Sequence, residues 1–322
     1  MKKIISFVFM LTMLLACESV LFAAEPAMQT VQETPIWRID NKNISTMPKS
    51  FRMATDPFQN KKIKGELPSR LGLENLHISG SSEFSFASYD KMIEKIKSVA
   101  SGPIYIVDLR QESHGFVNGI AVSAYISRDW INVGKSTAQV EKDEKAWLRS
   151  ALKAPIEISV LDDDKNAYET YKIVVDNALT EKEFVTSRGQ NYLRIQATDH
   201  SSFTNEQVND FVKFYKKLPQ DAWIHFHCMA GEGRTTQIMV MYDILRNGKQ
   251  VSFEDIVNRQ YLLGGNNATK ITVSNEKDSY KVPLYKEKVK LLKKFYEYVT
   301  TSPDDLPISW SKWIKEHNQD EE

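Results

Sequence analysis

The spacing of apolar side chains along the chain predicts alternating helices and strands. A helix is indicated by a side chain that can cap the first turn, followed by apolar residues three and four positions apart. Thr204 and Gln207 form such a capping signal, and Val208, Phe211 and Val212 follow at helical spacing. Helices are predicted after the caps Ser88, Thr204 and Ser252 and over residues 235–245, 283–299 and 308–314.

Short apolar runs predict two groups of strands. Residues 104–107 and 222–226 are almost entirely apolar and lie between predicted helices, as expected for a sheet that helices cover on both faces. Residues 130–195 differ, because polar turns there separate segments of alternating character. We therefore predict an α/β fold with a small antiparallel β-unit inserted at about residues 130–195. The strands of that unit are predicted at residues 156–160, 171–175 and 192–195.

The composition indicates a globular protein with balanced charge. The chain has 322 residues, 42% of them hydrophobic, with 42 basic and 42 acidic side chains. This amount of apolar material supports a large core and excludes a disordered chain or a small fold held by disulfides. The balanced charge argues against nucleic acid as a partner, so a site for a polyanion requires a local concentration of bases.

The N-terminus has the pattern of an export signal. Lys2 and Lys3 precede an apolar run at residues 4–16 that is too short to span a bilayer. Two processing routes remain open: cleavage after Ala24, or lipidation of Cys17 in a lipoprotein-like sequence. We expect a periplasmic or secreted protein, with a lipid anchor at Cys17 as the alternative, and no membrane span. The sequence does not predict an oligomeric state.

The strongest chemical signal lies between the strand at 222–226 and the helix at 235–245. Cys228 is followed by five residues, two of them glycine, and then by Arg234 and Thr235. Such a loop can turn its backbone N–H groups into one concavity at a helix N-terminus, where a tetrahedral oxyanion binds. Arg234 can hold two phosphate oxygens, the positive field favours the nucleophilic thiolate of Cys228, and the Thr235 hydroxyl can donate to the sulfur. The five residues of this phosphate loop are Met229, Ala230, Gly231, Glu232 and Gly233.

The sequence His-Cys-x5-Arg-Thr resembles the signature of cysteine-dependent phosphatases with the protein-tyrosine-phosphatase fold. Attack by a thiolate requires protonation of the leaving group, and in that superfamily an aspartic acid upstream of the cysteine supplies the proton. The resemblance implies that Asp199 is this general acid. The Trp-Pro pair that precedes the aspartate in protein tyrosine phosphatases is absent here.

Further motifs narrow the resemblance to the bacterial protein-tyrosine-phosphatase-like (PTP-like) phytases. These motifs are residues 107–119, Asp199–His200 and residues 227–236, and the resemblance extends from about Phe51 to Val299. It implies a phosphatase core, a mostly parallel sheet flanked by helices, beside a small partial β-barrel. It also implies stepwise removal of phosphates from inositol polyphosphates without metal or cofactor. The residues implied to contact substrate phosphates are Arg52, Asp129, Lys165, His200, Lys281 and Lys288.

Other residues near the loop have distinct expected roles. His225 and His227 lie on the strand face opposite Cys228, and no Cys-x-x-Cys pair completes a zinc site. We expect no metal, His225 in the core or supporting the site, and His227 bonded to the loop backbone, where it helps to fix the cysteine. Glu232 adds a carboxylate to the phosphate loop and should repel a polyanion if it faces the pocket.

The sequence therefore predicts an exported chain with one catalytic domain. The expected organisation is a signal peptide at residues 1–24, an irregular lead-in at 25–48, a phosphatase domain at 49–318 and an acidic tail at 319–322. The predicted function is a metal-independent phosphomonoesterase that hydrolyses inositol polyphosphates (phytate), small polyanionic substrates, through a cysteinyl phosphate. Two alternatives remain open: an exported protein tyrosine or dual-specificity phosphatase, and a phosphate-binding pseudophosphatase.

Overall fold

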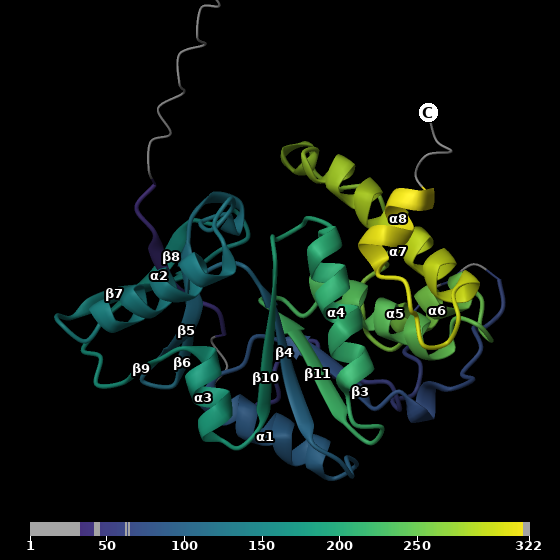
Figure 1. The fold of residues 1–322 in the computed structure, drawn as a ribbon. Helices are drawn as coiled ribbons and strands as arrows, with labels where there is room; N and C mark the ends of the chain where they lie inside the picture. The colour runs from purple at the N-terminus through teal and green to yellow at the C-terminus, as the bar shows by residue number, and fades with distance from the viewer. Residues whose placement is uncertain (1–32, 42–45, 62, 64, 318–322) are drawn as a thin grey trace, which may run out of the picture. The chain divides into compact units, whose positions relative to one another are not determined.

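The core of the protein is a five-stranded sheet (Figure 1). The computed structural model describes residues 33–41, 46–61, 63 and 65–317, so the predicted signal peptide and acidic tail lie outside the described residues. The strand order is β10-β4-β11-β3-β2, and every neighbouring pair is parallel except β2 with β3. The strands are β2 (Arg52–Met53), β3 (Ile78–Ser82), β4 (Ile104–Arg110), β10 (Asn191–Ala197) and β11 (Trp223–Cys228).

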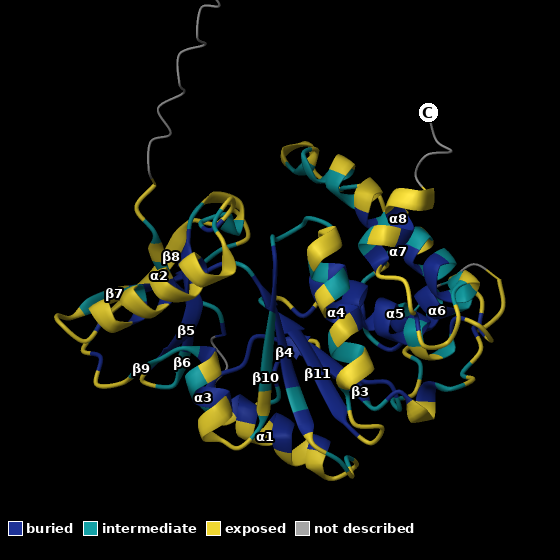
Figure 2. Ribbon diagram, viewed as in Figure 1, coloured by how far each residue is buried: buried dark blue, intermediate teal, exposed yellow. Residues whose placement is uncertain are grey.

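Helices cover both faces of this sheet because its strands carry apolar side chains on both sides. On β4, Ile104 and Ile106 pack in the cluster that contains α1 and α3, whereas Val107 and Leu109 pack in the cluster that contains α4 to α8. Figure 2 shows β11 buried between these layers. The helices are α1 (Phe86–Lys97), α3 (Glu181–Ser187), α4 (Asn205–Lys217), α5 (Gly233–Asn247), α6 (Phe253–Leu262), α7 (Lys281–Thr301) and α8 (Trp310–His317).

A second sheet of six strands, in the order β8-β7-β1-β6-β5-β9, packs against α2 (Thr137–Ser150). Its pairs are antiparallel except β1 with β7, which are parallel. Within the described residues its outer strands, β8 and β9, do not pair with each other, so the partial barrel is not confirmed. The strands are β1 (Ile36–Ile39), β5 (His114–Val117), β6 (Ile120–Tyr125), β7 (Ile156–Leu161), β8 (Ala167–Ile173) and β9 (Ala178–Leu179).

The boundaries predicted for the inserted β-unit are wrong at both ends. The lead-in expected to be irregular contains β1, and the sheet also takes in β5 and β6, which precede residue 130. Conversely, the segment predicted at 192–195 is β10 and belongs to the core sheet, where it pairs in parallel with β4. Alternating hydrophobicity predicts a strand but does not specify its partner, which is chosen by long-range packing.

Helix starts follow the capping chemistry closely. Thr204 and Ser252 cap α4 and α6 as predicted, and Gln207 completes the capping box of α4. The prediction for α1 is wrong by one turn, because Ser85 is its cap, and the Ser85 backbone N–H donates a hydrogen bond to the Ser88 hydroxyl. None of the described helices combines the length and the apolar character needed to cross a bilayer.

Candidate active site

The phosphate loop connects the end of β11 to the first turn of α5. Its conformation depends on Gly231, which has φ +73° and packs so closely on β3 that a Cβ there would lie 2.4 Å from the backbone of Ser81 and Ser82. Only glycine satisfies both conditions. At the base of the loop, the hydroxyl of Thr235 donates a hydrogen bond to Cys228 Sγ at 3.2 Å. The sulfur therefore lies beside a hydrogen-bond donor at the N-terminus of α5, and both features stabilise a thiolate.

Arg234 is held in place by a carboxylate that the sequence analysis did not single out. Its two terminal nitrogens donate to Glu112 Oε2 at 2.7 Å and Oε1 at 2.9 Å, a bidentate pair, and one also donates to the Ala197 carbonyl at 3.0 Å. Burial alone would lower the pKa of Arg234. The Glu112 carboxylate outweighs that effect and raises the pKa of Arg234 well above its usual value. The Nε of Arg234 is buried and has no hydrogen-bond partner among the described residues. The guanidinium of Arg234 is therefore held in one orientation, and its Nε–H can still donate a hydrogen bond to a ligand.

The Glu112–Arg234 pair gives a testable prediction. Glu112→Gln removes the charge and one of the two acceptors, so Arg234 should lose its fixed orientation and kcat/KM for an aryl phosphate should fall by about 100-fold, the loss typical of a missing oxyanion donor. The melting temperature should also fall, because a buried charge loses its partner. Glu94→Gln, at an exposed position of α1, is the control. Wild-type kinetics in folded Glu112→Gln would contradict this role.

Asp199 lies opposite the loop, next to both Arg234 and His200. Its carboxylate is 3.2 Å from Arg234 and 3.1 Å from His200 Nε2, and its side chain is 23% exposed. The indole N–H of Trp130 donates to the Asp199 backbone carbonyl at 3.2 Å. This hydrogen bond holds the backbone of Asp199 in place. Burial lowers the pKa of His200 to about 4, so this imidazole is neutral at neutral pH and Asp199 is its nearest acid.

A cavity of about 670 Å³, called here the main cavity, brings most of the predicted site residues together. Its walls come from both sheets, from the phosphate loop and from α7. Predicted residues that line it are Asp129, Lys165, Asp199, His200, Cys228, Met229, Ala230, Glu232, Gly233, Arg234, Lys281 and Lys288. Further lining residues that the sequence analysis did not name include Arg128, Tyr280 and Tyr285.

The lysines of the cavity differ in their surroundings. Lys288 is buried, and burial lowers its pKa to about 8, so it remains mostly protonated at neutral pH. Lys281 forms an ion pair with Asp278 at 2.7 Å, whereas Lys165 is exposed at the β7–β8 turn. The same turn reaches the segment before α7, where Asp164 forms an ion pair with Lys277. Bases from two distant parts of the sequence therefore surround one opening.

Arg52 does not line the main cavity, contrary to the predicted substrate contact. It is buried beneath the phosphate loop, where it donates to the Gly231 carbonyl at 2.9 Å and to Thr236 Oγ1 at 3.1 Å. Burial lowers its pKa to about 10. Arg52 thus supports the loop from behind, because β2 lies next to β3 on the side where Gly231 packs.

The prediction that His227 bonds the loop backbone is wrong. Its Nε2 lies 2.8 Å from Glu181 Oε1 on α3, and its Nδ1 has no hydrogen-bond partner among the described residues. Burial alone would lower the pKa of His227, but the carboxylates of Glu181 and Glu83 outweigh it and raise the pKa to about 9. His225 is in the core as expected, between the hydroxyls of Ser79 and Ser81.

Two buried triads contain residues of types that can ligate metals, and acids of both triads form ion pairs with arginines. They are Glu83–Glu181–His227 and Asp108–His114–Glu181. Carboxylates hold the pKa of both histidines above the usual value. The acids also form ion pairs with arginines, as Glu83 does with Arg110 and Asp108 with Arg194. The donor set therefore fits a network of buried ion pairs.

That network connects the phosphate loop to the second sheet. Glu112, which holds Arg234, also accepts from Arg110 at 2.8 Å, and Arg110 contacts Asp40 at 2.8 Å. Asp40 in turn pairs with Arg38 of β1 at 2.9 Å, and Arg38 reaches Asp129 at 2.8 Å on the wall of the main cavity. The segment after β6 thus supplies Asp129 to the cavity, and the second sheet supports Arg234 through a continuous chain of charges.

Comparison with known proteins agrees with this geometry. A family model for PTP-like phytases, whose description names inositol hexakisphosphate, matches residues 107–246. The structure of a PTP-like phytase from Bdellovibrio bacteriovorus superimposes with a TM-score of 0.68 at 28% identity, covering 88% of this chain and 96% of that one. A PTP-like myo-inositol phosphatase from Mitsuokella multacida, solved in complex with myo-inositol-(1,3,4,5)-tetrakisphosphate, superimposes with a TM-score of 0.83 at 39% identity. This chain belongs to the PTP-like phytase family.

The mixed α/β fold predicted from the sequence is thereby confirmed. The Mitsuokella match covers 88% of this chain but 49% of that one. The effector protein hopD2 of Pseudomonas syringae pv. tomato is 29% identical over 252 residues, which cover 75% of this chain and 52% of that protein. The chain therefore spans about half the length of these two relatives.

Proposed function

We propose that this protein removes phosphate groups from inositol polyphosphates through a cysteinyl phosphate. The observation that carries the proposal is the assembly of Cys228, Arg234 and Asp199 around one cavity that also exposes lysines. In addition, the Mitsuokella relative binds an inositol tetrakisphosphate. A ring with several phosphates needs cations beside the reacting group, and Lys165, Lys281 and Lys288 meet that need.

In the first step the Cys228 thiolate attacks phosphorus and the bond from phosphorus to the inositol oxygen breaks. The loop amides and Arg234 stabilise the charge on the phosphoryl oxygens, while Asp199 donates its proton to the leaving oxygen. In the second step water attacks the phosphocysteine, Asp199 takes the proton, and the phosphorus–sulfur bond breaks. The hydroxyl of Thr235 stabilises the departing thiolate, and orthophosphate is released. These groups supply all the positive charge and proton transfer, so the proposed reaction needs no metal or cofactor.

Glu232 opposes this assignment, since its exposed side chain borders the main cavity. Its carboxylate forms no ion pair with any of the described residues, so it weakens the positive potential of the opening. Four lysines and Arg128 border the same cavity and outweigh that single charge only in part, because five aspartates line it as well: Asp129, Asp163, Asp164, Asp199 and Asp278. The site therefore favours substrates whose phosphates reach the individual bases.

The test is a direct comparison of substrates. We expect a higher kcat/KM for inositol hexakisphosphate than for a phosphotyrosine peptide in dilute buffer. We expect the difference to shrink as salt is added, since screening weakens the attraction of the substrate to the lysines around the opening. Phosphate release and peptide dephosphorylation measure the two rates. Preference for the peptide would favour the tyrosine-phosphatase alternative, and failure to cleave any phosphomonoester would favour a pseudophosphatase.

We also propose that the chain is exported. The support is the charged and apolar pattern of its first 24 residues, with cleavage after Ala24 or lipidation of Cys17 as the two routes. Mass spectrometry of the mature N-terminus distinguishes them.

A further inference from the structure

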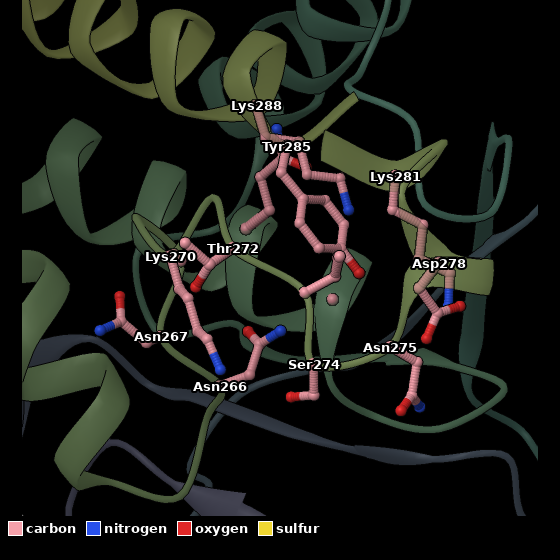
Figure 3. Close-up of a pocket in the computed structure, with 14 residues that line it drawn as sticks. Asn266, Asn267, Lys270, Thr272, Ser274, Asn275, Asp278, Lys281, Tyr285 and Lys288 are labelled. Carbon is pink, nitrogen blue, oxygen red and sulfur yellow. The ribbon is translucent and has the colours of Figure 1, made fainter. Parts of the chain in front are cut away.

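A second cavity of about 370 Å³ adjoins the main cavity, and we call it the side cavity. It lies between α7, the first turns of α5 and the loop after α6. Gly233, Lys281, Tyr285 and Lys288 line both cavities, so the two are neighbours along one wall. Figure 3 shows Tyr285 projecting from α7 into the side cavity, which Lys270 and Asn266 line from the loop.

Gln237 is the feature that marks the side cavity as a binding site. It lies one turn into α5 and is only 2% exposed, yet neither its amide nitrogen nor its amide oxygen has a hydrogen-bond partner among the described residues. Asn266, which also lines the cavity, has a buried side-chain oxygen in the same condition. A buried amide without partners costs free energy, so several such atoms around one cavity indicate a polar ligand or bound water.

The charges of the side cavity select an anion. Its lining includes three lysines and one acid, and that acid, Asp278, forms an ion pair with Lys281. The positive charges of Lys270 and Lys288 are left to act on a ligand. Lys288 Nζ lies beside the phosphate loop, 3.5 Å from the position that a Cβ on Gly233 would take. It is therefore placed at the border between the two cavities.

We propose that the side cavity binds a second phosphate group of the same substrate while another phosphate reacts over Cys228. The inference rests on the proposed function and adds Gln237, Asn266 and Lys270 to the residues that recognise the inositol polyphosphate. Lys270, Lys288 and the Gln237 amide nitrogen donate to phosphate oxygens. The oxygens of Gln237 and Asn266 accept from hydroxyl groups, which a partly dephosphorylated inositol ring also carries. A monophosphate has no group to place there, so the side cavity contributes to selectivity for polyphosphates.

Two substitutions test this proposal. Gln237→Leu removes both polar atoms at nearly constant volume, and Lys270→Ala removes an exposed charge from the loop. Each should lower kcat/KM for inositol hexakisphosphate by about threefold to tenfold more than kcat/KM for 4-nitrophenyl phosphate, the value expected for one lost hydrogen bond or ion pair. Lys293→Ala, at an exposed lysine of α7 outside both cavities, is the matched control and should not change this ratio. An unchanged ratio in both folded test variants would show that the side cavity holds only water.

A binding measurement separates this inference from the proposed function. Calorimetric titration of inositol hexakisphosphate into Cys228→Ser, with and without Gln237→Leu and Lys270→Ala, should show weaker binding when the side cavity is altered. That result upholds the side cavity as a polyphosphate site even if wild-type protein releases no phosphate from this ligand, whereas unaltered affinity overturns it. Inorganic phosphate serves as a competitive inhibitor of 4-nitrophenyl phosphate hydrolysis. Its inhibition constant should be unchanged by the two substitutions. If the two substitutions weakened inhibition by inorganic phosphate as much as binding of inositol hexakisphosphate, the side cavity would be a site for free phosphate. That result would overturn the inference.

Discussion

Replacing Cys228 with serine should abolish phosphate release while the protein still binds its substrate. A serine hydroxyl is not ionised at neutral pH and cannot replace the thiolate that the α5 N-terminus and Thr235 stabilise. The rate on 4-nitrophenyl phosphate should fall below about one hundredth of the wild-type rate, as for loss of any nucleophile in covalent catalysis. The loop amides and Arg234 remain, so calorimetry should still detect inositol hexakisphosphate binding to the variant.

Two controls accompany the Cys228→Ser measurement. The melting temperature should stay close to that of the wild type, since the substitution replaces a single side-chain atom. Treatment of the wild-type enzyme with EDTA should leave its rate unchanged, because the proposed chemistry uses no metal. Substantial turnover by the serine variant, or inhibition by EDTA, would contradict a mechanism through a cysteinyl phosphate.

The second large effect is expected from Asp199→Asn. The amide cannot protonate the leaving oxygen, so kcat for inositol hexakisphosphate should fall by about 10²–10⁴, the range for general acid–base catalysis. The loss should be smaller for 4-nitrophenyl phosphate, because nitrophenolate leaves without a proton. Comparing kcat for these two substrates measures the dependence on the leaving group.

Asp210→Asn, at an exposed acid of α4, serves as the control for the Asp199 variant. The structure offers a second role for Asp199, since its carboxylate also lies 3.2 Å from Arg234. If positioning Arg234 were its main contribution, Asp199→Asn would reduce turnover equally for both substrates. Equal losses would therefore rule out the general-acid role.

The sequence by itself determined those parts of the protein in which the interacting groups are close along the chain. The phosphate loop is one example, because Cys228, the two loop glycines and Arg234 lie within seven consecutive residues between a strand and a helix. The caps of α4 and α6 are another, since each is a hydrogen bond between residues three apart. Such features need only local backbone geometry, so their spacing reveals them.

Only the tertiary structure decided which distant groups meet at the site. Glu112 holds Arg234 across 122 positions of sequence, and Arg52 supports the carbonyl of Gly231 across 179. His227 forms its hydrogen bond with Glu181 on α3 and not with the loop backbone. Similarly, β10 pairs with β4 in the core sheet and not with strands of the inserted unit. Burial makes each of these pairings necessary, because a buried charge or backbone group must find a partner. The sequence does not specify that partner, since several acids, carbonyls and strand edges could meet the same need until the chain has packed.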